Sequence, residues 1–372
     1  MHLRKLRLFN FRNYREANIS FNRRITCVLG YNGSGKTNLL EAIHFLALTK
    51  CNSGITDLQN INHNETQFSI IGKMEMNGNA EEVVCQVVKG GKKLIKVEEE
   101  VCERLSSHIG RYPLIMVVPN DNDLIRGGSE LRRKFIDSVI CQTNERYLEE
   151  LLSYNRTLKQ RNSFLKQFEG RNNIDRDLIA VYDNTLSTAG KYIHAVRKEF
   201  VVEFTPYVVE YYKKVSGQQE DVTINYESDL DGNEYSALLK ENINRDLLLS
   251  RTEKGIHRDD YSLELNGEKA RKFSSQGQQK SIIIALKLAQ YQYIGELKGF
   301  HPLLLLDDIM DKLDDERISN LLSIIDESIK GQVFITDAGS DRLKDKFEAK
   351  RMEADWLYIY KGVISTSQRL KD

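Results

Sequence analysis

The most constraining feature of the sequence is the stretch Gly30-Tyr-Asn-Gly-Ser-Gly-Lys-Thr37, which stands between an apolar run and an apolar-periodic helix pattern. Its form, G-x-x-x-x-G-K-T, is typical in this context of a phosphate-binding loop. The glycines let backbone N–H groups turn towards a phosphate, and the start of the following helix adds partial positive charge. We expect Lys36 to reach the β- and γ-phosphates and the Thr37 hydroxyl to bind Mg²⁺. The predicted nucleotide-binding residues of this loop are Gly30, Tyr31, Asn32, Gly33, Ser34, Gly35, Lys36 and Thr37.

A second motif, Leu303-Leu-Leu-Leu-Asp307-Asp308, reads as an apolar strand that ends in two carboxylates. Such a strand would deliver Asp307 beside the Mg²⁺ of the loop, so Asp307 is the second predicted metal ligand. Asp308 would point to the other face of the strand, where it can meet an attacking water. Taken alone, an acidic pair after a strand is also a common helix N-cap.

The two motifs lie near opposite ends of the chain, which predicts a large insertion between two halves of one nucleotide site. We expect residues 1–120 to form the N-terminal part of an ATPase head and residues 246–372 its C-terminal part. Residues 121–245 would form a helical arm, because the pattern is helical from Ser129 to about Lys214. Buried strands that alternate with amphipathic helices indicate a parallel sheet, and hence an α/β fold.

Charge and cysteine spacing indicate in which compartment the protein works and which partners it has. The 372 residues hold 54 Lys and Arg against 54 Asp and Glu, so whole-chain charge indicates no nucleic-acid partner. Two local runs are basic, namely residues 1–24 and 156–176, and each is either a binding surface or a solvated face. The five cysteines have neither metal-ligand nor redox spacing. Without an apolar run of membrane length, the sequence predicts a soluble cytoplasmic protein that does not contact a membrane.

Ser275-Gln-Gly-Gln278 lies at the start of an apolar helix and resembles the signature loop of ABC-type ATPases. Such a loop meets the γ-phosphate of ATP held by a second subunit, through its hydroxyl, its N–H groups and the helix dipole. This predicts Ser275, Gly277 and Gln278 as nucleotide contacts in trans and a symmetric, ATP-closed dimer. The alternative is an ordinary polar N-cap. Asp311-Lys-Leu-Asp314 resembles the D-loop that crosses such a dimer interface.

Further short motifs occur in order along the chain. They are Asn10-Phe-Arg-Asn-Tyr14, Arg126-Gly-Gly128 with Arg132-Arg133, Tyr154-Asn-Arg156 with Lys159-Gln-Arg-Asn162, and Gly255-Ile-His-Arg-Asp-Asp260. Together with Asp307-Asp308 they resemble the pattern of the RecF family, the recombination-mediator ATPases of bacteria. The resemblance runs from residue 3 to about residue 340, although several of its blocks are short.

The resemblance implies an ABC-type P-loop ATPase head, related to SMC proteins, that is split by an inserted helical arm. It implies ATP and Mg²⁺ as cofactors and a homodimer that ATP assembles on single-stranded, gapped or junction DNA. Slow, DNA-stimulated hydrolysis would act as the release switch. RecO and RecR are the implied partners, in DNA replication, DNA repair and the SOS response. By position, Asp308 is the implied base, Lys36 the second catalytic residue, and Ser275 acts in trans.

Local charge predicts the DNA surface, because phosphate contacts come from Arg and Lys. The candidates are Arg4, Arg7, Arg132, Arg133, Arg156 and Arg161. The rival interpretation is that the arm arginines pair with Glu145, Glu149 and Glu150 and brace the helices. His257 reads equally well as a structural histidine or as part of an active site.

The chain departs from related ATPases at three places. Thr336-Asp337 follows the last buried strand, where ABC ATPases often carry a switch histidine. Residues 48–53 lack the arginine expected of many RecF chains, and no Q-loop glutamine follows Val118. The alternative function is an ABC-type ATPase subunit of a nuclease or phage-defence system. A second alternative, an ATP-gated DNA clamp, overlaps with the RecF interpretation. A small-molecule kinase is disfavoured, because the residues Ser275–Gln278 would have no function in it.

Overall fold

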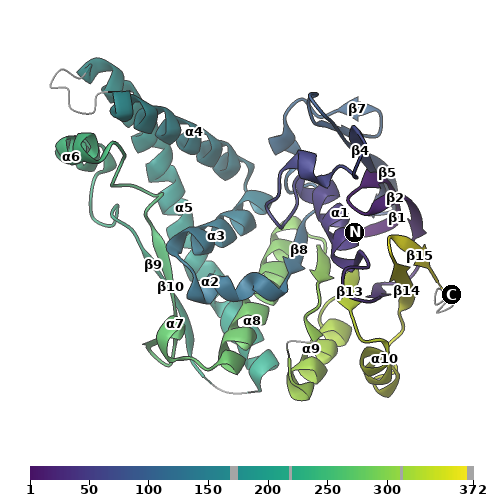
Figure 1. Ribbon diagram of the computed structural model, residues 1–372. Coiled ribbons are helices and arrows are strands. Elements are labelled where there is room, and N and C mark those ends of the chain that lie inside the picture. The colour runs from purple at the N-terminus through teal and green to yellow at the C-terminus, as the bar shows by residue number, and fades with distance from the viewer. Residues whose placement is uncertain (168–174, 218–219, 311–312, 367–372) are drawn as a thin grey trace. The chain divides into compact units, whose positions relative to one another are not determined.

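The computed structural model describes residues 1–167, 175–217, 220–310 and 313–366, and for residues 340 and 341 it describes the backbone alone. The chain forms two compact units (Figure 1). Unit 1 consists of residues 1–121, 210–218 and 280–372, and unit 2 of residues 122–209 and 219–279. The first boundary falls beside the predicted one at 120/121. The second predicted boundary, at 245/246, differs from the division into units. Residues 246–279, predicted to belong to the head, group with unit 2, and residues 210–218, predicted to belong to the arm, group with unit 1.

One sheet of unit 1 has the strand order β15-β14-β3-β13-β12-β8. The five strands from β14 to β8 run parallel, and β15 is antiparallel to β14. The apolar runs of residues 25–29, 114–117, 303–306 and 333–337 are buried on both faces, as expected of a parallel sheet. The strands are β3 (Ile25–Leu29), β8 (Leu114–Val117), β12 (Leu303–Leu306), β13 (Val333–Asp337), β14 (Asp355–Tyr360) and β15 (Val363–Ser365).

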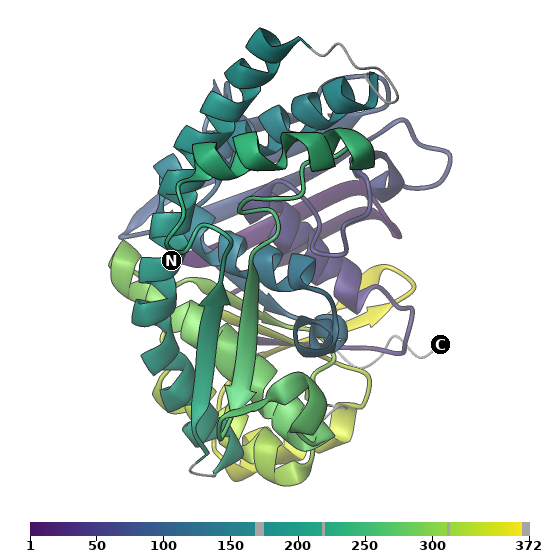
Figure 2. The ribbon, with the colours of Figure 1, turned by 90° about the vertical axis from the view of Figure 1, so that its left-hand side faces the viewer.

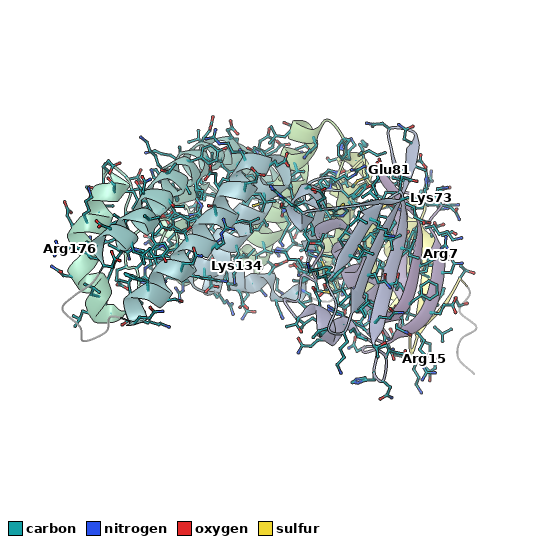
Figure 3. The ribbon with its side chains drawn as sticks, turned by 90° about the horizontal axis from the view of Figure 1, so that it is seen from above. Arg7, Arg15, Lys73, Glu81, Lys134 and Arg176 are labelled. Carbon is teal, nitrogen blue, oxygen red and sulfur yellow. The ribbon has the colours of Figure 1, made fainter. Side chains whose placement is uncertain are left out.

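The second sheet of unit 1 is antiparallel, in the order β2-β1-β4-β5-β6-β7. Asn77 and Gly78, both at positive φ (51° and 83°), form the tight turn that joins β4 to β5. One face is buried, and Arg7 and Lys73 stand on the other (Figure 3). The strands are β1 (His2–Phe11), β2 (Tyr14–Ser20), β4 (Gln67–Met76), β5 (Asn79–Val88), β6 (Leu94–Val97) and β7 (Glu100–Val101).

The helices of unit 1 bury apolar stripes against these sheets. Helix α1 (Lys36–Leu48) shares one apolar core with strands of both sheets. Trp356, the only tryptophan of the chain, lies on β14 and packs edge-on against Phe347 of α10. The remaining helical elements are α9 (Asp315–Glu327), α10 (Ser340–Ala349), most of α8 (Gln276–Lys298), and the short turns η1 (Asp57–Asn60), η2 (Leu105–His108) and η3 (Pro119–Asn122).

Unit 2 combines helices with a small antiparallel sheet of order β11-β10-β9. Figure 2 shows β9 and β10 running side by side, as their pairing requires. Two arginines, Arg161 and Arg197, are fully buried in this unit. Its elements are α2 (Asp123–Arg126), α3 (Ser129–Thr143), α4 (Glu145–Gln167), most of α5 (Arg176–Ser216), β9 (Val222–Glu227), α6 (Tyr235–Leu249), β10 (Asp260–Leu265), β11 (Glu268–Lys269) and α7 (Ala270–Phe273).

Within the described ranges, no helix is both long and apolar enough to cross a bilayer.

Candidate nucleotide-binding site

The loop between β3 and α1 has the backbone that a phosphate-binding loop needs. Gly33 and Gly35 adopt positive φ values of 77° and 122°, a region that favours glycine. Helix α1 begins at Lys36, and its N-cap residue Gly35 places no side chain over the helix start. The first N–H groups of an α-helix have no partner within the helix. This end of α1 can therefore donate to an anion.

Close packing explains two of the glycines. A Cβ atom on Gly30 would lie 2.4 Å from the carbonyl oxygen of Ile359, and one on Gly35 would lie 2.6 Å from Nδ2 of Asn13. Asn13 also donates from Nδ2 to the Ser34 carbonyl oxygen at 3.0 Å. The loop is thus held from behind by β14 and by the β1–β2 turn, and a side chain at either position would push it forward.

Lys36 is the predicted phosphate-binding cation of this loop. Its side chain is 3% exposed, its Nζ donates to the Gly30 carbonyl oxygen at 2.9 Å, and it lies 3.8 Å from Oδ1 of Asp308. The Oγ of Ser34 is buried and has no hydrogen-bond partner among the residues that the structure describes. A buried hydroxyl without a partner is costly, so its presence in the loop fits a site shaped for a further polar group. The residues present therefore fit the phosphates of a nucleotide.

Thr37 and Asp307 come together as the sequence predicts. The Thr37 hydroxyl donates to the Asp307 carboxylate, at 3.1 Å to Oδ1 and 3.0 Å to Oδ2. Burial raises the pKa of the Asp307 carboxyl, and the hydroxyls of Thr336 and Thr37 oppose this shift. A hydroxyl and a carboxylate are the oxygen ligands that Mg²⁺ accepts, and Mg²⁺ commonly takes only one or two of them from the protein. Over the described residues, no group of three or more His, Cys, Asp or Glu could hold a metal by itself.

Asp308 lies beside this pair in an unusual conformation. Its φ is 44°, in the left-handed region that few non-glycine residues adopt. Its N–H donates to Oγ1 of Thr336 at 2.9 Å, and its side chain is 27% exposed. The carboxylate is therefore open to solvent and beside Lys36, a position in which it can accept a proton from water.

Arg12, for which the sequence indicated no role of its own, braces the residues behind the loop. Arg12 donates to Oδ1 of Asn60 and of Asn38 at 2.8 Å each, and it lies 3.6 Å from the buried carboxylate of Glu41. The Asn10–Tyr14 motif was the available signal, but nothing in its residue types shows which side chain turns towards α1.

The signature residues form a capping box at the start of α8. The Ser275 hydroxyl accepts from the Gln278 N–H at 3.2 Å, and the Gln278 side chain accepts from the Ser275 N–H at 2.7 Å. The N-cap interpretation is thus confirmed, and Ser275 stays exposed. A role in trans remains a prediction. Of the D-loop motif, Asp311 and Lys312 lie outside the described residues, and Asp314 caps α9.

The structure contradicts part of the predicted DNA surface. Arg161 is fully buried, 2.7 Å from Asp183 and 2.7 Å from Asp246, so it cannot contact DNA. Its charge is compensated inside the unit because a buried cation without a partner would be very costly. The proposed partners Glu145, Glu149 and Glu150 are also wrong, since both acids come from elsewhere in unit 2.

Most of the other arginines predicted to bind DNA already form ion pairs or hydrogen bonds within the protein. Arg132 donates to both carboxylate oxygens of Asp260 at 2.8 and 3.0 Å, and Arg133 donates to the Asp259 carbonyl oxygen. Arg4 is paired with Glu75 at 2.6 Å, and Arg7 lies 3.6 Å from Glu82. Arg156 is exposed, and no ion pair joins it to another described residue.

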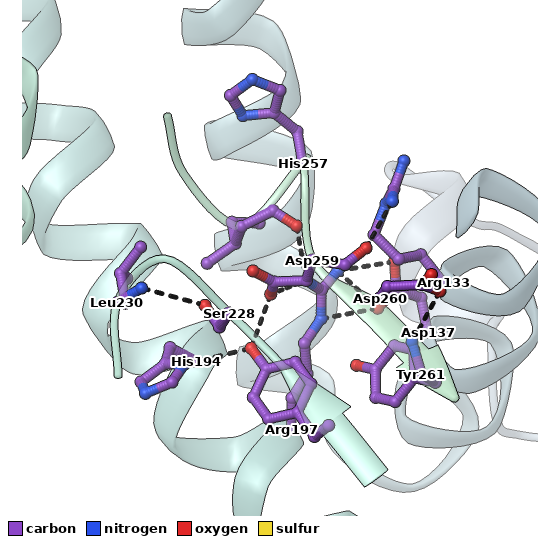
Figure 4. A network of polar contacts seen from close by, with 12 residues as sticks. Arg133, Asp137, His194, Arg197, Ser228, Leu230, His257, Asp259, Asp260 and Tyr261 are labelled. Atoms are coloured by element: carbon purple, nitrogen blue, oxygen red, sulfur yellow. Dashed lines mark hydrogen bonds and ion pairs between the residues drawn. The ribbon is translucent and has the colours of Figure 1, made fainter. Parts of the chain in front are cut away.

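His257 is a structural histidine. Its Nδ1 accepts from the Tyr154 hydroxyl at 2.8 Å, and its Nε2 donates to the Thr252 carbonyl oxygen at 3.0 Å. Burial lowers the pKa of His257 to about 4. Figure 4 shows it beside the buried Arg197–Asp259 centre, whose ion pair measures 2.7 Å. These side chains pin the Gly255–Asp260 motif inside unit 2.

Comparison with known proteins places this geometry in a family. A family model described as an AAA domain matches residues 5–186. The chain is 43% identical to the DNA replication and repair protein RecF of Flavobacterium johnsoniae, over 92% of this chain and 95% of that one. It is 40% identical to the RecF of Cytophaga hutchinsonii, over 99% and 97%.

Solved structures agree with these relatives. The chain is similar to a structure of the recombination mediator protein RecF–ATP in the RecFOR pathway, with a TM-score of 0.88 and 28% identity over 98% of this chain and 97% of that one. An SMC head bound to the C-terminal winged-helix domain of ScpA matches with a TM-score of 0.56 at 16% identity, over 98% and 96%. That likeness concerns the fold alone, which is the predicted SMC-like, ABC-type P-loop ATPase head.

Proposed function

This chain belongs to the RecF family of DNA replication and repair proteins, and we propose that it is an ATP-dependent DNA-binding protein in which slow ATP hydrolysis acts as a release switch. The observation that carries the proposal is the cluster of Lys36 and Thr37, at the start of α1, with Asp307 and Asp308, which directly follow β12. These are the cation, the metal-ligand pair and the carboxylate that phosphoryl transfer to water requires.

Each residue has a definite task in this proposal. Lys36 exchanges its hydrogen bond to the Gly30 carbonyl for contacts to the β- and γ-phosphates of ATP. Thr37 and Asp307 would hold Mg²⁺, which would neutralise charge on the phosphates. Asp308 orients the attacking water and accepts its proton. The exposed face of its carboxylate leaves room for that water.

We propose that ATP closes a homodimer through the signature residues Ser275, Gly277 and Gln278. Ser275 is exposed at the start of α8, where its hydroxyl and the helix end can meet the γ-phosphate held by a second copy of the chain. DNA, RecO and RecR are the proposed partners, supported by the RecFOR pathway to which the similar RecF–ATP structure belongs. DNA contacts would be made mainly to phosphates, with weak sequence preference.

The nucleotide site is tested with Lys36→Ala. We expect the variant to lose ATP binding by at least tenfold, because the buried ammonium is the cation that faces the phosphates. The exposed Lys92 supplies the matched control, Lys92→Ala, which should bind ATP like the unmodified chain. Equilibrium binding of a fluorescent ATP analogue measures both. Equal binding by a folded Lys36→Ala variant would refute the assignment.

The dimer is tested by light scattering with ATP and DNA. Asp308→Asn should accumulate the dimer, since ATP still binds while water is no longer activated. Ser275→Arg should prevent it, because a bulky cation replaces a hydroxyl that must approach a second copy. Asn79, exposed at the first position of β5, supplies the control for added charge, Asn79→Arg. A chain that remains monomeric with ATP and DNA contradicts the proposed dimer.

A further inference from the structure

One buried hydroxyl joins the two carboxylate residues of the site. Thr336 stands near the carboxyl end of β13, is 0% exposed, and donates from Oγ1 to Oδ1 of Asp307 at 2.8 Å. The same Oγ1 accepts from the N–H of Asp308 at 2.9 Å. Thr336 belongs to the Thr336-Asp337 pair at the end of β13, the region in which ABC ATPases often carry a switch histidine.

The hydrogen-bonding capacity of a hydroxyl makes this contact selective. A threonine hydroxyl has one proton and two lone pairs. Oδ1 of Asp307 at 2.8 Å is the near acceptor for that proton, and Oδ1 of Asp308 at 3.4 Å is the distant one. The lone pairs remain free to accept the Asp308 N–H. A single atom therefore sets the rotation of one carboxylate and the backbone of the next residue.

The backbone contact matters because Asp308 is strained. A left-handed conformation is costly for a non-glycine residue and persists where surrounding contacts impose it. The N–H of Asp308 is directed at Thr336, and in this conformation its carboxylate lies 3.8 Å from the Lys36 ammonium. Without the acceptor at position 336, the left-handed conformation loses a hydrogen bond that supports it.

The side-chain contact matters once Asp307 and Thr37 become metal ligands. Their mutual hydrogen bonds at 3.0 and 3.1 Å are then exchanged for contacts to the cation. Among the described residues, Thr336 is the side chain that still donates to Asp307. Partners that orient a ligating carboxylate contribute to metal affinity and activity by roughly 10- to 100-fold.

We propose that Thr336 is a positioning residue that couples Asp307 to Asp308 in ATP hydrolysis. The inference rests on the proposed function. It differs from a role in phosphate contact, because Thr336 acts through the two carboxylate residues. Its hydroxyl, and not merely its volume, is the feature required.

The test compares three variants of the full chain. Thr336→Val keeps the shape and removes the hydroxyl, and Thr336→Ser keeps the hydroxyl. The control is Thr26→Val on β3, since Thr26 is equally buried and lies opposite Phe334 of β13. In the described part of the chain, the Thr26 hydroxyl has no hydrogen-bond partner. Should Thr336→Val fail to fold, Thr336→Cys, whose thiol is a weak donor, replaces it with the same expectation.

Two measurements separate positioning from a general loss of structure. We expect Thr336→Val to lower kcat for ATP hydrolysis about tenfold or more and to raise by about tenfold the Mg²⁺ concentration at which a fluorescent ATP analogue is half bound. Binding of the analogue without Mg²⁺ should stay unchanged. Thr336→Ser and Thr26→Val should keep values within about threefold of the unmodified chain.

The outcomes distinguish this inference from the proposed function. If the unmodified chain binds and hydrolyses ATP while Thr336→Val matches it in kcat and in Mg²⁺ dependence, the positioning role is overturned and the proposed function stands. A Thr336→Ser variant as impaired as Thr336→Val also overturns it. If the unmodified chain neither binds nor hydrolyses ATP, the proposed function itself is wrong.

Discussion

Arg161→Leu tests whether the charge on α4 serves structure or DNA. The guanidinium is fully buried and donates to Asp183, to Asp246 and to the Thr252 hydroxyl at 2.7 to 2.8 Å. Removing one partner of such a buried ion pair typically costs about 3–5 kcal/mol. In a unit of about 150 residues, each kcal/mol shifts the midpoint of thermal unfolding by roughly 2–4 °C, so we expect a decrease of about 10 °C.

Helical circular dichroism during heating measures this loss, because α4 and most of α5 belong to unit 2. Burial raises the pKa of Asp246 and Arg161 opposes that shift, so the second variant Arg161→Leu/Asp246→Asn should recover part of the loss. Arg156→Ala on the same helix is the exposed control and should melt unchanged. An Arg161→Leu variant that melts normally but binds DNA weakly would refute the structural role.

Three other predictions address pH, the loop and DNA. Folding lowers the pKa of His257 from its ordinary 6.5 to about 4. The stabilisation of the fold by neutral His257 is therefore fully present above pH 6.5 and is lost as the pH falls towards 4. At pH 5 the free energy of unfolding should be lower by about 2 kcal/mol. His257→Gln should accordingly show a smaller decrease in urea midpoint between pH 7 and pH 5. Gly35→Ala should weaken ATP-analogue binding at least tenfold, because its Cβ would lie 2.6 Å from Nδ2 of Asn13, whereas Gly78→Ala, with open space around it, should not. Arg156→Glu should lower DNA affinity and reduce by about one the slope of log K against log salt concentration, measured by fluorescence anisotropy; an unchanged slope removes Arg156 from the surface.

The arrangement of the candidate nucleotide site was predictable because its signals are local in the sequence. A glycine pattern between a strand and a helix fixes the loop, and the strand Leu303–Leu306 is recognisable by composition alone. The contact between Thr37 and Asp307 was predicted because, in P-loop ATPases, a phosphate-binding loop and an apolar strand that ends in a carboxylate bind the same Mg²⁺. In the sequence, Thr336 stood out only because ABC ATPases often carry a switch histidine in this region. No sequence pattern indicates that its hydroxyl lies between two carboxylate residues.

The error at Arg161 has a physical cause that the helix pattern contained. Tyr154, Thr157, Arg161 and Phe164 recur at spacings of three and four residues, and all four are buried. Counting charge along the chain ignores this stripe. The boundary at 245/246 failed for a different reason: β10 pairs with β9 across many intervening residues, and such non-local pairing leaves no mark in the local sequence.

Trp356 gives the protein an intrinsic fluorophore in a useful place. It lies opposite Cys27 on β3, the strand that runs into the loop at Gly30, and the Ile359 carbonyl of its own strand closes the space behind that glycine. Unit 2 contains no tryptophan. Emission excited at the red edge of protein absorbance therefore reports on unit 1 alone, whereas circular dichroism reports on both units. A titration or an unfolding experiment recorded with both signals can separate events in the nucleotide-binding unit from those in the other unit without any added dye.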